Sequence, residues 1–177
     1  MVRTIITVFC ICDDYLKVIG YKDDPQVQMT TSEVMTTAII AARYFSGNYE
    51  KSREFLFWHG YIPKMISKSR FSRRLNAIDL DVLNEIFSVI AQGFIKANID
   101  GDYAIDSFPI AVCANVRMER CKIFESKDYY GFCASKQQFY YGVKVHMLVT
   151  KSGQPVEFII EPGASSDIKI ARSFKFN

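Results

Sequence analysis

The sequence predicts an α+β protein, with a helical region over residues 1–98 followed by a β-rich region over residues 102–177. Apolar residues recur at helical spacing throughout the first region, whereas after Gly101 they fall in strand-like runs. Hydrophobic residues make up 49% of the chain and charged residues 23%, which is typical of a folded globular protein. The change of period near Gly101 marks the predicted boundary between two domains.

Helices in the first region are expected to begin and end at recognisable capping residues. Thr30 and Glu33 have the spacing of a capping box, in which each side chain accepts the other residue's backbone N–H. Asn48 is placed to cap the next helix, which Gly60 ends. The expected helices cover residues 2–20, 30–47, 49–59, 67–76 and 80–98.

Strand-like runs in the second region predict a three-stranded antiparallel meander. The runs cover residues 103–110, 139–150 and 155–161, and residues 151–154 form a turn between the last two. Residues 111–138 are too long for a simple hairpin loop and mix basic with aromatic side chains. A sheet of this size with only a short following helix is expected to leave one face uncovered.

Composition argues against several classes of protein. The net charge of +3 is too small to indicate a nucleic-acid partner without a local basic cluster. The five cysteines include no C-x-x-C pair, which favours reduced thiols in the cytoplasm over disulfides or a zinc site. The apolar run at residues 5–12 is shorter than the roughly 20 residues that span a bilayer. A buried helix is therefore expected there, and no membrane anchor.

Asp106 is a carboxylate inside the otherwise apolar run 103–109. A carboxylate in mid-strand is costly to bury unless it is paired or binds a cation. Two interpretations remain open: a functional carboxylate, or an edge-strand residue that faces water.

A basic cluster without any acid lies between Gly60 and Asn76. Three arginines share one face of the expected helix at i, i+3 and i+4, so they could face a phosphate backbone together. Two helices and a turn precede them, as in a helix-turn-helix arrangement. The alternative is an ordinary solvated helix face. The cluster consists of Lys64, Lys68, Arg70, Arg73 and Arg74.

Two further polar residues, Asp167 and His146, have structural as well as functional interpretations. Asp167 follows two serines at the start of a helical pattern, where an acid stabilises a helix N-terminus. His146 alternates with apolar neighbours and shares the polar face of its strand with Lys144. This pattern fits either a histidine close to a functional site or an ordinary histidine on the polar face of a strand.

Four ordered blocks of residues resemble transposases of the insertion sequence 982 family, which belong to the Asp-Asp-Glu (DDE) class. The blocks read IDSFPIAVC (105–113), GFCASK (131–136), YYGVKVH (140–146) and GQPVEF (153–158), the last continuing through 162–163 and 166–167. The resemblance extends back through the basic cluster to residues 12–15, so it covers nearly the whole chain. Blocks in this order are more specific than any single motif.

The resemblance implies a helical, helix-turn-helix-like DNA-binding region over residues 1–98 and a ribonuclease-H-like catalytic domain over residues 102–177. In that class two aspartates and a glutamate hold a pair of Mg²⁺ ions, and Asp106 matches the first aspartate. The chain reaches only the first three strands of that fold, so the second aspartate and the glutamate are missing. We therefore expect a truncated copy without strand-transfer activity, or a non-catalytic DNA-binding regulator of the full-length transposase.

The partners implied are double-stranded DNA at the element's terminal inverted repeats and a second subunit. That subunit would form a homodimer, or a heterodimer with the full-length transposase. The expected DNA contacts include the five residues of the basic cluster and four more from the second region. These four are Arg117, Arg120, Lys136 and Lys144.

Overall fold

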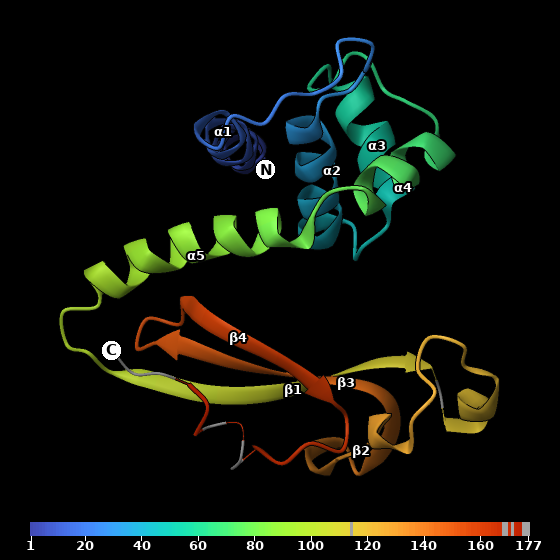
Figure 1. Ribbon diagram of the computed structural model, residues 1–177, viewed down its shortest axis with the longest axis vertical. Coiled ribbons are helices and arrows are strands. Elements are labelled where there is room, and N and C mark those ends of the chain that lie inside the picture. The colour runs from blue at the N-terminus through green and yellow to red at the C-terminus, as the bar shows by residue number, and fades with distance from the viewer. Residues whose placement is uncertain (114, 168–169, 171, 175–177) are drawn as a thin grey trace. The chain divides into compact units, whose positions relative to one another are not determined.

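The computed structural model of the protein describes residues 1–113, 115–167, 170 and 172–174. The chain divides into two compact units, Met1–Ile86 and Phe87–Asn177. The predicted α+β class is confirmed, because the described residues form five α-helices and then an antiparallel sheet of four strands (Figure 1). The division between the units falls inside the fifth helix, before the change of apolar period at Gly101.

The helices begin where their capping residues predict. Thr30 Oγ1 accepts the Glu33 N–H at 3.3 Å and a Glu33 carboxylate oxygen accepts the Thr30 N–H at 2.6 Å, so the capping box is confirmed. Asn48 Oδ1 accepts the Lys51 N–H at 3.1 Å. The helices are α1 (Val2–Val18), α2 (Thr31–Tyr44), α3 (Tyr49–Trp58), α4 (Lys68–Asn76) and α5 (Leu80–Ala97).

Helix α1 covers the apolar N-terminal run. Ile5, Cys12 and Leu16 are buried along one stripe, whereas Val18 is exposed. Burial of a single stripe is the pattern of an amphipathic helix packed on a core. Among the described residues, no helix is long and apolar enough to cross a membrane.

One apolar core holds the helical unit together. Phe71 is the buried residue of α4 and is only 1% exposed. Because so little else of α4 is buried, this one ring is the main apolar anchor of the helix. The buried members of the core are Ile5, Met29, Val34, Ile40, Leu56, Ile62, Ile66 and Phe71.

Two arginines fix the position of α4. Arg53, on α3, donates to the Glu50 carboxylate at 2.7 Å and to the carbonyl of Ile66, just before α4. Arg74, on α4, donates to Asp23 Oδ1 at 2.7 Å and also to the Met29 carbonyl. These charge-assisted hydrogen bonds tie both ends of α4 to neighbouring segments of the helical unit.

The sheet is built around one long central strand. The strands are β1 (Tyr103–Cys113), β2 (Tyr130–Cys133), β3 (Gln138–Thr150) and β4 (Pro155–Pro162). Strand β3 pairs antiparallel with each of the other three. The predicted meander corresponds to β1, β3 and β4, and the predicted turn is confirmed by Gly153, whose N–H donates to the Thr150 carbonyl at 2.8 Å. The short strand β2 was not predicted.

Strand β1 has one open edge, where no described strand pairs with it. Lys151 N–H donates to the Asp102 carbonyl at 3.1 Å, which sets the alternation of hydrogen bonds along β1. Up to Ile110, before the register shift between Ala111 and Cys113, even-numbered residues of β1 then bond to β3 and odd-numbered N–H groups point to the open edge. Pro109 lies at an odd position and so costs the sheet no ladder hydrogen bond.

The two faces of the sheet differ in polarity. Cross-strand pairs Ser107↔His146 and Pro109↔Lys144 lie on one face, and Asp106↔Met147 and Phe108↔Val145 on the other. On the second face, Phe158 of β4 contacts Phe87 of α5, with ring centroids 5.0 Å apart. Phe108 nevertheless stays 43% exposed and Ile160 55%. Part of this apolar face is thus open, as the sequence predicts.

Candidate functional site

Asp106 lies near the middle of β1, and its side chain is exposed. Its Oδ1 accepts the N–H of Ser107 at 2.8 Å, on the open edge of the strand. Both interpretations drawn from the sequence are compatible with this position, because an edge strand is also where an incoming group can reach the carboxylate. The strand holds Asp106 at a fixed point that solvent and ligands can reach.

Asp167, by contrast, is placed on the opposite face of the sheet from Asp106. Its Oδ1 accepts the Ser107 hydroxyl at 3.0 Å and the Lys144 ammonium at 3.3 Å. His146 Nδ1 lies 3.6 Å from the same oxygen. Neighbouring residues of a strand point to opposite faces, so Asp106 does not belong to the cluster of Ser107, Lys144, His146 and Asp167.

The electrostatics of this polar cluster favour an ionised aspartate and a neutral histidine. Burial raises the pKa of Asp167, but hydrogen bonds from Ser107 and Lys144 outweigh it and leave the pKa below its usual value. Burial lowers the pKa of His146, although Asp167 opposes the shift. The histidine is only 1% exposed, and its Nε2 has no hydrogen-bond partner among the residues that the structure describes. The sequence placed it correctly with Lys144 but did not predict this burial.

Hard divalent cations such as Mg²⁺ need several oxygen ligands, usually carboxylates. Within residues 1–113, 115–167, 170 and 172–174, no group of three or more His, Cys, Asp or Glu side chains could hold a metal ion. Asp106 therefore belongs to no such group of three or more ligands among these residues. These residues do not fit a pair of Mg²⁺ ions, so no metal-dependent reaction step is assigned to them.

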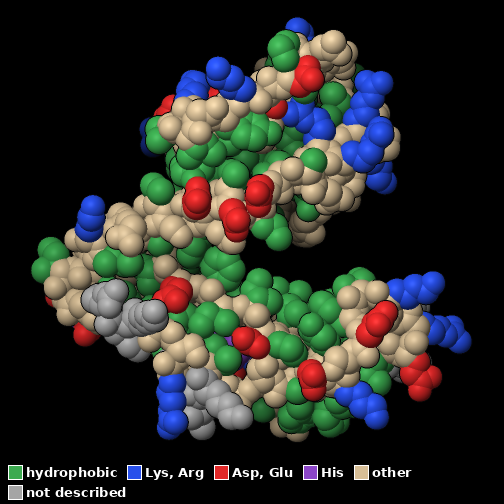
Figure 2. Space-filling model, viewed as in Figure 1, with side chains coloured by type: hydrophobic (Ala, Val, Ile, Leu, Met, Phe, Trp, Pro, Cys, Tyr) green, Lys and Arg blue, Asp and Glu red, His purple; other side chains and the backbone are tan. Residues whose placement is uncertain are grey.

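The basic cluster lies on and before α4 in the helical unit, where Figure 2 shows Lys and Arg side chains gathered along one side. Arg70 and Arg73 are exposed, as are Lys64 and Lys68. Arg74 differs, because its guanidinium is half-buried against Asp23. Four of the five cations thus face solvent, while the fifth, Arg74, forms an ion pair with Asp23 inside the helical unit.

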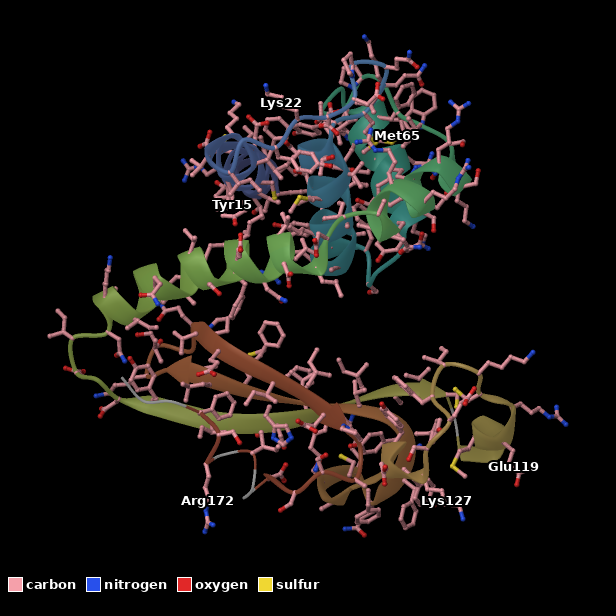
Figure 3. The ribbon with its side chains drawn as sticks, viewed as in Figure 1. Tyr15, Lys22, Met65, Glu119, Lys127 and Arg172 are labelled. Carbon is pink, nitrogen blue, oxygen red and sulfur yellow. The ribbon has the colours of Figure 1, made fainter. Side chains whose placement is uncertain are left out.

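The four basic residues expected to contact DNA from the second region are scattered. Arg120 and Lys136 are exposed at 3₁₀ turns on either side of β2, whereas Lys144 lies on β3 and binds Asp167. The side chain of Arg117 lies outside the described residues. Figure 3 shows Glu119 and Lys127 in the same segment between β1 and β2, which therefore carries both acids and bases. The described side chains of this segment do not form a basic surface comparable to that of α4.

The long-range pairs beside α4 and in the polar cluster of the sheet could not be predicted from local sequence. Asp23 reaches Arg74 across 51 positions, and Ser107 reaches Asp167 across 60. In the sequence, each pair is indicated only by a polar residue: Asp23 lies at a turn, and Ser107 follows the carboxylate residue Asp106 in the predicted strand. Sequence patterns identify the cations and carboxylates but not which of them the fold neutralises.

A helical unit with an exposed basic helix, followed by an antiparallel sheet with a carboxylate on its first strand, is compatible with a nuclease fold of the DDE type. Residues 96–177 match a family model described as Transposase DDE domain, which covers slightly less than half of the chain. No curated protein and no solved structure matches the chain. The matched residues include the whole sheet, Asp106 and Asp167, and they exclude α4.

The match supports a DDE-class transposase and, in general terms, transposition as the function. Domains of this class generally use divalent metal ions, and proteins that transpose DNA must bind it. The basic helix α4 lies outside the matched range, so its role is inferred from its exposed lysine and arginine side chains and not from the match.

Proposed function

We propose that this chain acts on DNA as a DDE-class transposase polypeptide, with the helical unit binding DNA and the sheet unit carrying Asp106 as the first carboxylate. The match of residues 96–177 to a transposase DDE domain supports this proposal most strongly. The exposed cations of α4 support the DNA-binding part, because a phosphate backbone is recognised first by lysine and arginine.

The finer proposal is a transposase of the insertion sequence 982 family that binds the terminal inverted repeats of its element. The four blocks of the sequence that resemble this family fall on β1, on β2 with the turn after it, on β3 and on β4. A dimer, either of this chain or with a full-length transposase, is part of the same proposal. Localisation in the cytoplasm, where the genome of a bacterium lies, goes with it.

A second function, that of a non-catalytic regulator, is favoured because Asp106 belongs to no group of three or more metal-ligating side chains among the described residues. One carboxylate does not organise two metal ions for phosphodiester chemistry. A chain that binds the element's ends without cutting them would compete with an active transposase for the same DNA. We therefore propose DNA binding without cleavage as the activity of residues 1–177.

A mobility-shift assay tests the binding proposal directly. Full-chain protein is titrated into labelled inverted-repeat DNA, with unlabelled repeat DNA and unrelated DNA as competitors. We expect a complex that weakens steeply with salt and that repeat DNA removes better than unrelated DNA. Absence of any complex at low salt would contradict the proposed function.

A further inference from the structure

A groove of about 400 Å³ lies between α4 and the loop that precedes α2. One wall is the α4 side, from which three arginines enter, and the other is the loop at residues 26–28. The loop is folded back by Asp24, whose carboxylate accepts the Gln26 N–H at 2.8 Å and whose carbonyl accepts the Val27 N–H at 3.0 Å. The groove is lined by Gln26, Val27, Gln28, Ile66, Arg70, Arg73, Arg74 and Ala77.

The two walls of the groove are held together from within the fold. Arg74 donates to Asp23 and to the Met29 carbonyl, on either side of the loop. Met29 itself is completely buried, so the loop cannot move away from α4 without exposing it. The groove is therefore a preformed feature that ligand binding need not create.

The groove carries positive charge that can bind an anion. Arg74 is neutralised by Asp23, but among the described residues neither Arg70 nor Arg73 has an ion pair. Among the described residues no carboxylate lines the groove, and Arg73 Nε makes a long hydrogen bond of 3.4 Å to the Ser69 carbonyl of its own helix. Two guanidinium groups thus remain free to bind an anion.

The opposite wall adds neutral donors and apolar surface. Gln26 and Gln28 are exposed, and their side-chain amides can donate hydrogen bonds to an anion oxygen. Val27, Ile66 and Ala77 contribute apolar atoms to the same lining. An anion with an apolar neighbour, such as a phosphodiester with its deoxyribose, matches this lining better than a bare inorganic ion.

We propose that this groove is a seat for one backbone phosphate of DNA, with Arg70 and Arg73 binding its oxygens from α4 and Gln28 from the loop. This inference rests on the proposed function and deepens it, because it places a phosphate contact in a groove rather than on an open helix face. Both walls contribute to binding, so changes at residues 26–28 weaken DNA binding although these three residues include no cation.

The test measures DNA affinity by fluorescence anisotropy for the full chain over a range of salt concentrations. We expect Arg70→Gln and Arg73→Gln each to weaken binding about tenfold, and each to reduce the slope of log K against log salt concentration by about 0.9. Gln28→Glu places a negative charge on the loop wall and is expected to weaken binding about tenfold as well. Gln92→Glu, on the exposed surface of α5, makes the same charge change away from the groove and is expected to change affinity less than twofold.

The outcomes separate the inference from the proposed function. A wild-type complex that Gln28→Glu weakens no more than Gln92→Glu would overturn the groove and leave DNA binding in place. Absence of any complex with the wild-type chain would overturn both. Each variant is first compared with wild type by circular dichroism and thermal unfolding, and Gln26→Glu serves as a second loop variant if Gln28→Glu alters the fold.

Discussion

The helical unit and the sheet unit differ in how completely each covers its own apolar surface. Among the described residues, one buried apolar cluster of the helical unit contains eight residues, whereas a buried cluster between α5 and the sheet contains Ala91, Leu148, Val156 and Phe174. In the described part of the chain no strand pairs with the outer edge of β1, and Phe108 is exposed. The groove beside α4 is thus supported by its own unit, while Asp106 lies on the strand that stays open.

The largest effect is expected from the anchor of α4. Phe71→Ala removes a ring that is 1% exposed, and we expect it to lower the free energy of unfolding of the helical unit by about 3–5 kcal/mol. Trp58→Ala is the matched control, because that ring is 78% exposed, and its effect should be within about 0.5 kcal/mol. Chemical denaturation followed by circular dichroism measures both, and equal effects would contradict the assignment of Phe71 to the core.

A smaller effect is expected from the close approach of β1 and β3 at Gly142. A Cβ at this position would lie 2.1 Å from the Ile110 carbonyl oxygen, so Gly142→Ala must displace backbone. We expect a loss of about 1–3 kcal/mol in the stability of the sheet unit. Hydrogen exchange along β3 measures it.

Gly93→Ala is the control for that substitution, because a Cβ on this α5 glycine meets nothing within 4 Å. Replacing an exposed glycine inside a helix should instead stabilise the unit by about 0.5–1 kcal/mol. The same sign for both substitutions would contradict the packing described for β1 and β3.

The pH dependence of the sheet unit should reveal the buried histidine. Burial holds the pKa of His146 below its usual 6.5, so on acidification the unfolded chain takes up a proton before the folded one. Stability is therefore full above about pH 6.5 and falls as the pH drops below it. The Asp167 contribution is lost only at more acidic pH, because its pKa lies below the usual 3.8.

His146→Gln removes the titrating group and should flatten this fall between pH 6.5 and 4. Lys144, Glu161 and Asp167, the charged groups that act on His146, remain in place in the variant. The measurement is thermal unfolding at each pH with segment-resolved hydrogen exchange. An unchanged slope in the variant would show that another group titrates in this range.

Much of the fold follows from local sequence, for reasons that individual residues make clear. Thr30 and Glu33 lie three positions apart, so their reciprocal capping could be predicted and was confirmed. Strand β2 has only four residues within a basic and aromatic segment, and its pairing with β3 depends on tertiary contact. Short strands give too few alternating positions for a period to be recognised.

The candidate sites were predictable as residue types but not as arrangements. The basic cluster and Asp106 stand out because cations without acids, or an acid among apolar residues, are local patterns. The ion pair between Arg74 and Asp23 joins residues that are far apart in the chain. The burial of His146 beside Asp167 likewise depends on a residue distant in sequence. Such neutralisation and burial come from the fold, which local patterns do not specify.

The most direct test of the account is a cleavage assay with inverted-repeat DNA and either Mg²⁺ or Mn²⁺. Purified residues 1–177 are incubated with end-labelled DNA, and each sample is divided between a native gel and a denaturing gel. We predict a retarded, salt-sensitive complex on the native gel and intact strands on the denaturing gel. Specific cleavage that disappears in Asp106→Ala would contradict the account, because Asp106 would then work with ligands that the chain itself supplies.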